Sequence, residues 1–94
     1  MLTKETYIEQ MKMQLDDWNA EIDELEIKAA KATGLARKKC RAEIVKLHRQ
    51  SHLLADKLDQ IKSANEDSWE SVVEGVEEMR ASVVRSFHYL QSQL

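Results

Sequence analysis

The sequence predicts an all-α fold, an antiparallel, coiled-coil-like helical bundle with three helices in its cross-section. Three observations support this prediction. The 94 residues include no proline, and 33% of them are charged, which is the composition of long helices. Apolar residues recur at spacings of three and four, the heptad pattern of helices that pack side by side. The pattern divides into three stripes of similar length, one for each helix.

The three stripes define the predicted elements of a single domain, residues 1–94. The first helix is expected at about residues 3–32, and the second at about 36–63. A turn is expected at 64–67 and a third helix at about 68–92. In this turn Asn65 is expected to take the left-handed conformation that follows many helices, and Asp67 or Ser68 to cap the next helix.

The predicted core consists of large apolar residues on the stripes. They are Trp18, Ile22, Leu25, Ile44, Leu47, Leu54, Leu58, Trp69, Val76, Met79, Val83 and Phe87.

Gly34 is the predicted hinge, and two conformations are open to it. A glycine suits the residue just past a helix, so the chain can turn there. However, Arg37, Lys38 and Lys39 would then crowd the start of the next helix, where cations are disfavoured, and no good capping residue precedes them. A glycine inside a helix costs only about 1 kcal/mol relative to alanine. These arguments favour a helix that continues through residue 34.

Two architectures follow from these alternatives. If the chain turns at Gly34, it folds as a monomeric three-helix bundle. If residues 3–62 form one helix, two chains pair as an antiparallel homodimer, a domain-swapped version of the same bundle. The continuous helix favours the homodimer.

Charges are sorted into blocks on either side of Gly34. An antiparallel pairing centred near residue 32 would place position 16 beside 48 and position 26 beside 38. A charge seam would then select the orientation of the helices, while the apolar stripes supply stability. The acids of this seam are Asp16, Asp17, Glu21, Asp23, Glu24 and Glu26, and its bases are Arg37, Lys38, Lys39, Arg41, Lys46 and Arg49.

His48 and His52 are weak candidates for metal binding. They lie one helical turn apart, but two imidazoles do not complete a site, and Cys40 is about two turns before His48. No metal and no cofactor are therefore expected. No nucleophile with a base and no phosphate-binding loop occur in the sequence, so the chain is not expected to be an enzyme.

Nucleic acid and membranes are disfavoured as partners. The bases of residues 37–49 could contact phosphates, but aromatic residues do not interleave with them and the acids of the seam would occupy them. The third helix could lie on a lipid surface, but its polar face is mostly acidic, the reverse of most membrane-surface helices. The polar N-terminus lacks an apolar signal region, which predicts a cytoplasmic protein.

Two stretches resemble a known family. Residues 4–29 read KETYIEQMKMQLDDWNAEIDELEIKA and residues 65–79 read NEDSWESVVEGVEEM. They resemble a family of short bacterial coiled-coil proteins, described as coiled-coil-domain or stress-response proteins. Thr33-Gly34 and Asn65 depart from that family's pattern. The matching residues are Tyr7, Leu15, Asp17, Trp18, Asn19, Glu21, Ile22 and Asp23, followed by Trp69, Glu70, Gly75, Val76 and Glu77.

The resemblance implies a soluble bacterial helical protein linked to stress, and it brings no catalytic residue or cofactor. Together with the residue patterns, it predicts a non-enzymatic helical interaction protein that associates with itself or with an unknown protein. The first alternative is a peripheral membrane or lipid-stress protein that docks its third helix. The second is nucleic-acid binding through residues 37–49.

Overall fold

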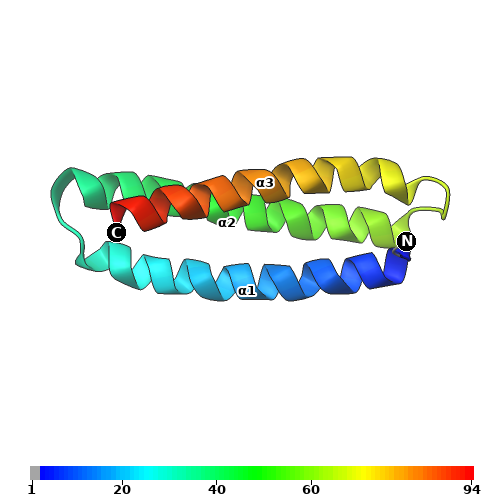
Figure 1. Cartoon of the computed structure of the whole chain (residues 1–94), viewed down its shortest axis with the longest axis horizontal. Coiled ribbons are helices and arrows are strands. Elements are labelled where there is room, and N and C mark those ends of the chain that lie inside the picture. The colour runs from blue at the N-terminus through cyan, green and yellow to red at the C-terminus, as the bar shows by residue number, and fades with distance from the viewer. Residues whose placement is uncertain (1–2) are drawn as a thin grey trace.

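The structure is a computed structural model that describes residues 3–94, and it forms an all-α bundle of three helices. Helix α1 spans Lys4–Lys31, α2 spans Gly34–Ser63 and α3 spans Trp69–Gln93. Each helix runs antiparallel to the next, so the α1–α2 turn lies at one end of the bundle and the α2–α3 turn at the other (Figure 1). The bundle measures 50 × 19 × 18 Å.

The chain turns before Gly34, so the continuous helix over residues 3–62 that the charges favoured is wrong. Ala32 and Thr33 have extended backbones, and Gly34 has a φ of 64°. This left-handed value is one that glycine adopts without a steric penalty. Gly34 therefore starts α2 instead of continuing α1, and the first two stripes pack together within one chain.

The second turn differs in detail from the prediction. Helix α2 ends through Ala64, whose backbone is extended, and no described non-glycine residue has a positive φ. The predicted left-handed conformation of Asn65 is therefore wrong. The carbonyl of Asn65 instead accepts hydrogen bonds from the backbone N–H groups of Ser68 and Trp69, and these bonds close the turn. Ser68 occupies the cap position of α3, but its side chain makes no capping hydrogen bond.

The core runs the length of the bundle. All predicted core residues are buried except Met79, which is partly buried against the others. Helix α2 packs closely against both other helices, whereas the backbones of α1 and α3 approach each other less. Aromatic side chains fill the wider space between α1 and α3. Tyr7 packs against Trp69 at a centroid distance of 5.9 Å and Trp18 against Phe87 at 6.3 Å, with the ring planes tilted by 45° and 46°.

Candidate interaction surface

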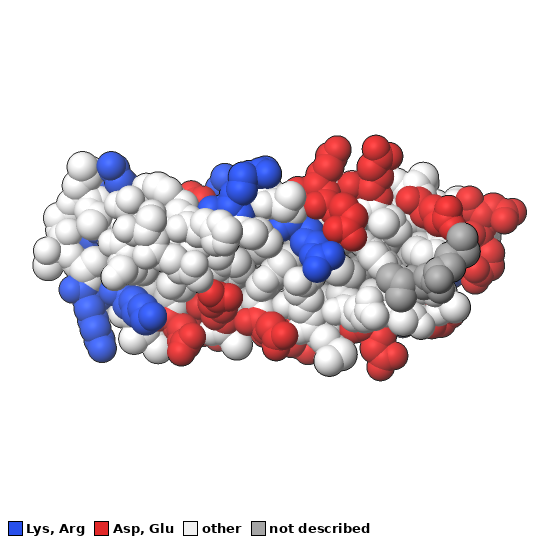
Figure 2. Space-filling view, in the orientation of Figure 1, with Lys and Arg blue, Asp and Glu red and all other residues white. Residues whose placement is uncertain are grey.

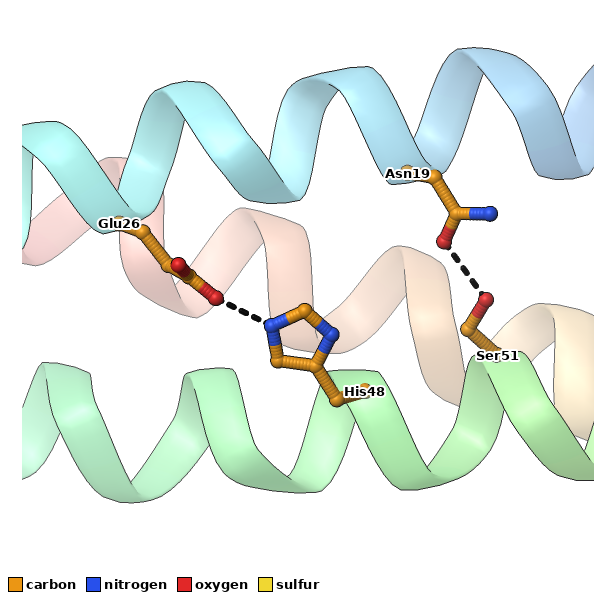
Figure 3. A network of polar contacts seen from close by, with 4 residues as sticks. All are labelled: Asn19, Glu26, His48 and Ser51. Carbon is orange, nitrogen blue, oxygen red and sulfur yellow. Dashed lines mark hydrogen bonds and ion pairs between the residues drawn. The ribbon is translucent and has the colours of Figure 1, made fainter.

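The side of the α1–α2 pair that faces away from α3 has two polar contacts between helices. The hydroxyl of Ser51 donates to Oδ1 of Asn19 at 2.7 Å. The imidazole of His48 contacts a carboxylate oxygen of Glu26. Figure 3 shows both contacts in front of α3, which runs behind the pair. This outer side of α1 and α2 is therefore open to solvent, and no third helix covers it.

The predicted charge seam does not form as direct ion pairs. Among the described residues, Glu26 and His48 make the one ion-pair contact within 4.0 Å that joins two helices. Lys46 contacts Glu43 at 3.9 Å within α2. No acid of the predicted seam contacts a Lys or Arg of residues 37–49 within this distance in the part of the chain that the structure describes.

The direction of helical side chains accounts for part of this difference. Glu26 reaches a residue ten positions beyond the expected position 38, which is more than the lean alone provides, so the two helices are also offset in register. Side chains of a helix lean toward its N-terminus. On α1 they lean away from the α1–α2 turn, and on α2 they lean toward it. A side chain of α1 therefore meets the side chain of an α2 residue that lies farther from the turn than the α2 residue level with its own backbone. Glu26, expected beside position 38, reaches His48.

The same lean leaves the first cations of α2 without acids opposite them. Lys38 is the fifth residue of α2, close to the turn, and the last turn of α1 on the other side of that turn carries Lys28 and Lys31. Positive side chains from both helices therefore gather around the α1–α2 turn, and we call this region the basic end. It contains Lys28, Lys31, Arg37, Lys38, Lys39, Arg41 and Lys46.

Acidic side chains gather at the opposite end, around the α2–α3 turn. Figure 2 shows most of the visible Lys and Arg in the left half and middle of the bundle, and Asp and Glu concentrated toward the right, with further Asp and Glu along the lower edge. The left is the side of the α1–α2 turn in Figure 1. We call the right-hand region the acidic end. It contains Glu66, Asp67, Glu70, Glu74, Glu77 and Glu78.

A shallow hollow of about 340 Å³ lies at the basic end, between α1 and α2. Its floor is apolar, and Arg37 and Arg41, one helical turn apart, stand on one side of it. We call this hollow the basic groove. Its other lining residues are Glu26, Ala29, Ala30, Ile44, Val45 and His48.

Large apolar side chains are exposed at the basic end. Ile27 is 60% exposed, Leu35 67% and Val45 59%. Single exposed apolar residues are ordinary, but these three accompany a concentration of cations, all of which except Lys46 make no ion pair within 4.0 Å in residues 3–94. Apolar surface combined with arginine is typical of residues that contact protein partners.

Tyr7 and Glu77 form a polar contact at the acidic end that the sequence did not reveal. The phenol donates a hydrogen bond to a carboxylate oxygen of Glu77 at 3.3 Å. Burial, followed by the charge and hydrogen bond of Glu77, raises the pKa of Tyr7 to about 12, although Arg80 opposes the shift. Both residues were noted as part of the family resemblance, but their separation of 70 positions hid the contact.

The remaining candidates take ordinary positions. His52 is exposed, and Cys40 is fully buried in the core. In residues 3–94 no group of three or more His, Cys, Asp or Glu side chains is arranged to hold a metal ion. No helix among these residues is long and apolar enough to cross a membrane.

Comparison with known proteins found no matching family model, no similar curated protein and no similar solved structure.

Proposed function

We propose that this chain is a non-enzymatic helical interaction protein that self-associates through its oppositely charged ends. The observation that supports this proposal is the separation of charge along the bundle. The seven cations of the basic end lie toward the α1–α2 turn, and the six acids of the acidic end lie toward the α2–α3 turn, where Lys4 and Arg80 are also found. Figure 2 shows this separation on one face of the bundle. The basic end of one molecule is therefore electrostatically complementary to the acidic end of another.

The folded bundles themselves are the units that associate in this proposal. The domain-swapped homodimer required a continuous helix through residue 34, and α1 ends at Lys31. Exposed ion pairs contribute only about 0–1 kcal/mol each, so association through the ends is weak and depends on salt. The exposed apolar residues Ile27, Leu35 and Val45 add contact area beside the cations.

Sedimentation velocity over a range of protein concentrations tests this proposal. The expected result is an average mass that rises with concentration at about 0.01 M ionic strength, where the Debye length is ~30 Å. The mass is expected to fall to that of one chain at about 1 M, where the Debye length is ~3 Å. A single 10.9-kDa species at every concentration and low salt would refute self-association.

One observation favours a second candidate function, the binding of a polyanion such as nucleic acid at the basic end. In the predicted charge seam, the acids of α1 would occupy the cations of α2 and keep them from phosphates. Among the described residues Arg37, Lys38, Lys39 and Arg41 make no ion pair within 4.0 Å. Phosphate contacts by these side chains would weaken steeply with salt. A gel shift with random-sequence DNA and RNA at low and moderate salt tests this candidate.

Membrane docking by α3 has less support. Its apolar residues Val76, Val83, Phe87 and Leu90 are buried in the bundle, so docking would require the bundle to open. Co-sedimentation with neutral and anionic vesicles tests this alternative. A role in stress is supported by the family resemblance alone.

A further inference from the structure

We propose that a second copy of this chain docks into the basic groove with the N-terminal half of its α3. Repetition of this contact builds an open, head-to-tail assembly. This inference rests on the self-association proposed above and names its surfaces. The occupying surface is a row of carboxylates on α3, Glu70, Glu74 and Glu78, which we call the acidic ridge.

The acidic ridge is exposed, and it forms no ion pair with another described residue. Its three members are all solvent-exposed and follow one another at intervals of four residues, so they share one side of α3. Within residues 3–94 none of them makes an ion pair within 4.0 Å, whereas the neighbouring Glu77 contacts Tyr7 and Arg80. The ridge therefore presents carboxylates that no Lys, Arg or His of the described residues contacts within 4.0 Å.

The spacing of charges on the two surfaces matches. Arg37 and Arg41 are four residues apart on α2, as Glu70 and Glu74 are on α3, so each pair is separated by the same helical turn. Two arginine–glutamate contacts can therefore form at once between two packed helices. Arginine binds a carboxylate through two parallel hydrogen bonds, which gives the contact a defined geometry.

The apolar floor of the basic groove suits a helix. Ala29 and Ala30 are small, and with Ile44 and Val45 they leave a hollow between α1 and α2. Amphipathic helices dock into grooves of this kind, with apolar contacts beneath and charged contacts at the edge. Most of Val45 is exposed, so a docked helix would cover apolar surface that water now contacts.

The positions of the two surfaces make the assembly open. The basic groove lies on the side of α1 and α2 that faces away from α3, the side that is in front in Figure 3. The acidic ridge lies on the exposed side of α3, across the bundle and at its other end. One neighbour cannot cover both surfaces at once. Each chain therefore contacts two different neighbours, a head-to-tail arrangement that does not close as a dimer.

Charge reversal tests this arrangement by sedimentation velocity at about 0.01 M ionic strength. The groove variant is Arg37→Glu/Arg41→Glu, and the ridge variant is Glu70→Lys/Glu74→Lys. Assemblies of the wild-type protein are expected to become larger than a dimer as the protein concentration rises. Each variant alone is expected to raise the dissociation constant about tenfold or more, because two favourable contacts become repulsive. A mixture of the two variants is expected to restore growth, because their reversed surfaces complement each other.

Two controls make the result specific. The variant Lys38→Glu/Lys39→Glu changes the net charge of the basic end by the same amount as the groove variant, but at residues that do not line the groove. This variant is expected to form assemblies larger than a dimer, as the wild type does. Thermal melts check that each variant folds. If a reversal variant unfolds, the corresponding Arg→Gln or Glu→Gln pair replaces it, and weakened growth is still expected.

Several results would overturn the inference. Growth that stops at the dimer would mean a closed interface. Groove or ridge variants that assemble like wild type would mean that other surfaces mediate association, and self-association itself would still stand. Equal loss in the Lys38/Lys39 control, or no recovery in the mixture, would exclude the groove as the docking site. A wild type that remains monomeric would refute both this inference and the proposed self-association.

Discussion

Helices α2 and α3 begin at opposite ends of the bundle, and the charges around their first turns are opposite. Helix α3 begins at Trp69 with Glu66, Asp67 and Glu70 nearby, and these acids complement the partial positive charge of a helix N-terminus. Helix α2 begins at Gly34 with no acid in its first turn and no side-chain cap from Thr33. Arg37 ends this first turn, where the helix dipole disfavours a cation, and three further cations follow it.

The two helix starts differ in whether they follow the rules of helix stability. The start of α3 follows those rules and needs no partner. The start of α2 departs from them, and such departures are expected at functional sites. The basic end is therefore the part of the bundle whose charges a partner would neutralise, and the predictions below test whether charge alone distinguishes the two ends.

The largest expected effect concerns the core, which we expect to be equally strong toward both ends. Trp69 packs against Tyr7 near the acidic end, Trp18 packs against Phe87 farther along the bundle, and both tryptophans are 8% exposed. Replacing either by alanine should lower the free energy of unfolding by about 3–5 kcal/mol. Urea denaturation monitored by circular dichroism measures the loss. A loss below about 1 kcal/mol at one site would show that the core differs between the two regions.

The next prediction concerns the two glycines. Replacing each by alanine should change the stability of the bundle in opposite directions. Gly34→Ala should destabilise the bundle by about 1–2 kcal/mol, because alanine is strained at a φ of 64°. Gly75 lies inside α3, and a Cβ added there meets nothing within 4 Å. Gly75→Ala should therefore stabilise by about 1 kcal/mol. Thermal melts of both variants measure the shifts, and stabilisation by Gly34→Ala would contradict the turn.

A smaller effect compares equivalent positions at the two helix starts. Leu35 and Glu70 are each the second residue of their helix, and Leu35 is 67% exposed. Leu35→Glu should stabilise the bundle by about 0.3–1 kcal/mol, and Glu70→Gln should destabilise it by a similar amount. Leu35→Gln is the control that keeps the polarity without the charge. Both effects should shrink in high salt, and salt-independent effects would show that the helix dipole is not their cause.

The last effect is a pH dependence confined to the acidic end. The folded pKa of Tyr7, about 12, lies above the usual 10 of an unfolded tyrosine, so the phenol is held protonated in the folded state. The raised pKa of Tyr7 adds to the free energy of unfolding, and this added stability is complete below pH 10 and is lost as the pH rises toward 12. Tyr7→Phe should therefore lose less stability than wild type over this range. The measurement is urea denaturation at several alkaline pH values, with Tyr89→Phe as the control that should behave like wild type.

The sequence was sufficient to predict the bundle, because each heptad stripe buries one face of a helix. Trp18, Leu47 and Val83 illustrate this: each was predicted from its spacing alone, and each is buried. The prediction that the helix continues through Gly34 was wrong because the cations after the glycine were expected to prevent a helix from starting there. The structure starts α2 there in spite of these unfavourable cations. The backbone angle that turns the chain there is local, and composition does not reveal it.

The candidate surface was harder to predict than the fold. The acids and bases were recognised as separate blocks, but they were paired by backbone position. Side chains such as Glu26 and His48 lean along their helices, which helps to shift the contacts away from the turn. In residues 3–94 the cations nearest the turn, such as Arg37, therefore make no ion pair within 4.0 Å. The acidic ridge was assigned to the solvated face of the third helix. Its relation to the basic groove required the bundle's three-dimensional arrangement, because the two lie at opposite ends.

Paramagnetic relaxation between molecules tests the central claim most directly. A spin label is attached to a Ser71→Cys/Cys40→Ala variant, which places the label beside the acidic ridge and removes the buried thiol. This chain is mixed with an unlabelled, 15N-enriched wild type at low ionic strength. We predict broadening of amide signals around residues 37–45 of the 15N chain, and its loss in high salt. Broadening centred on the acidic end, or none anywhere, would contradict a head-to-tail contact.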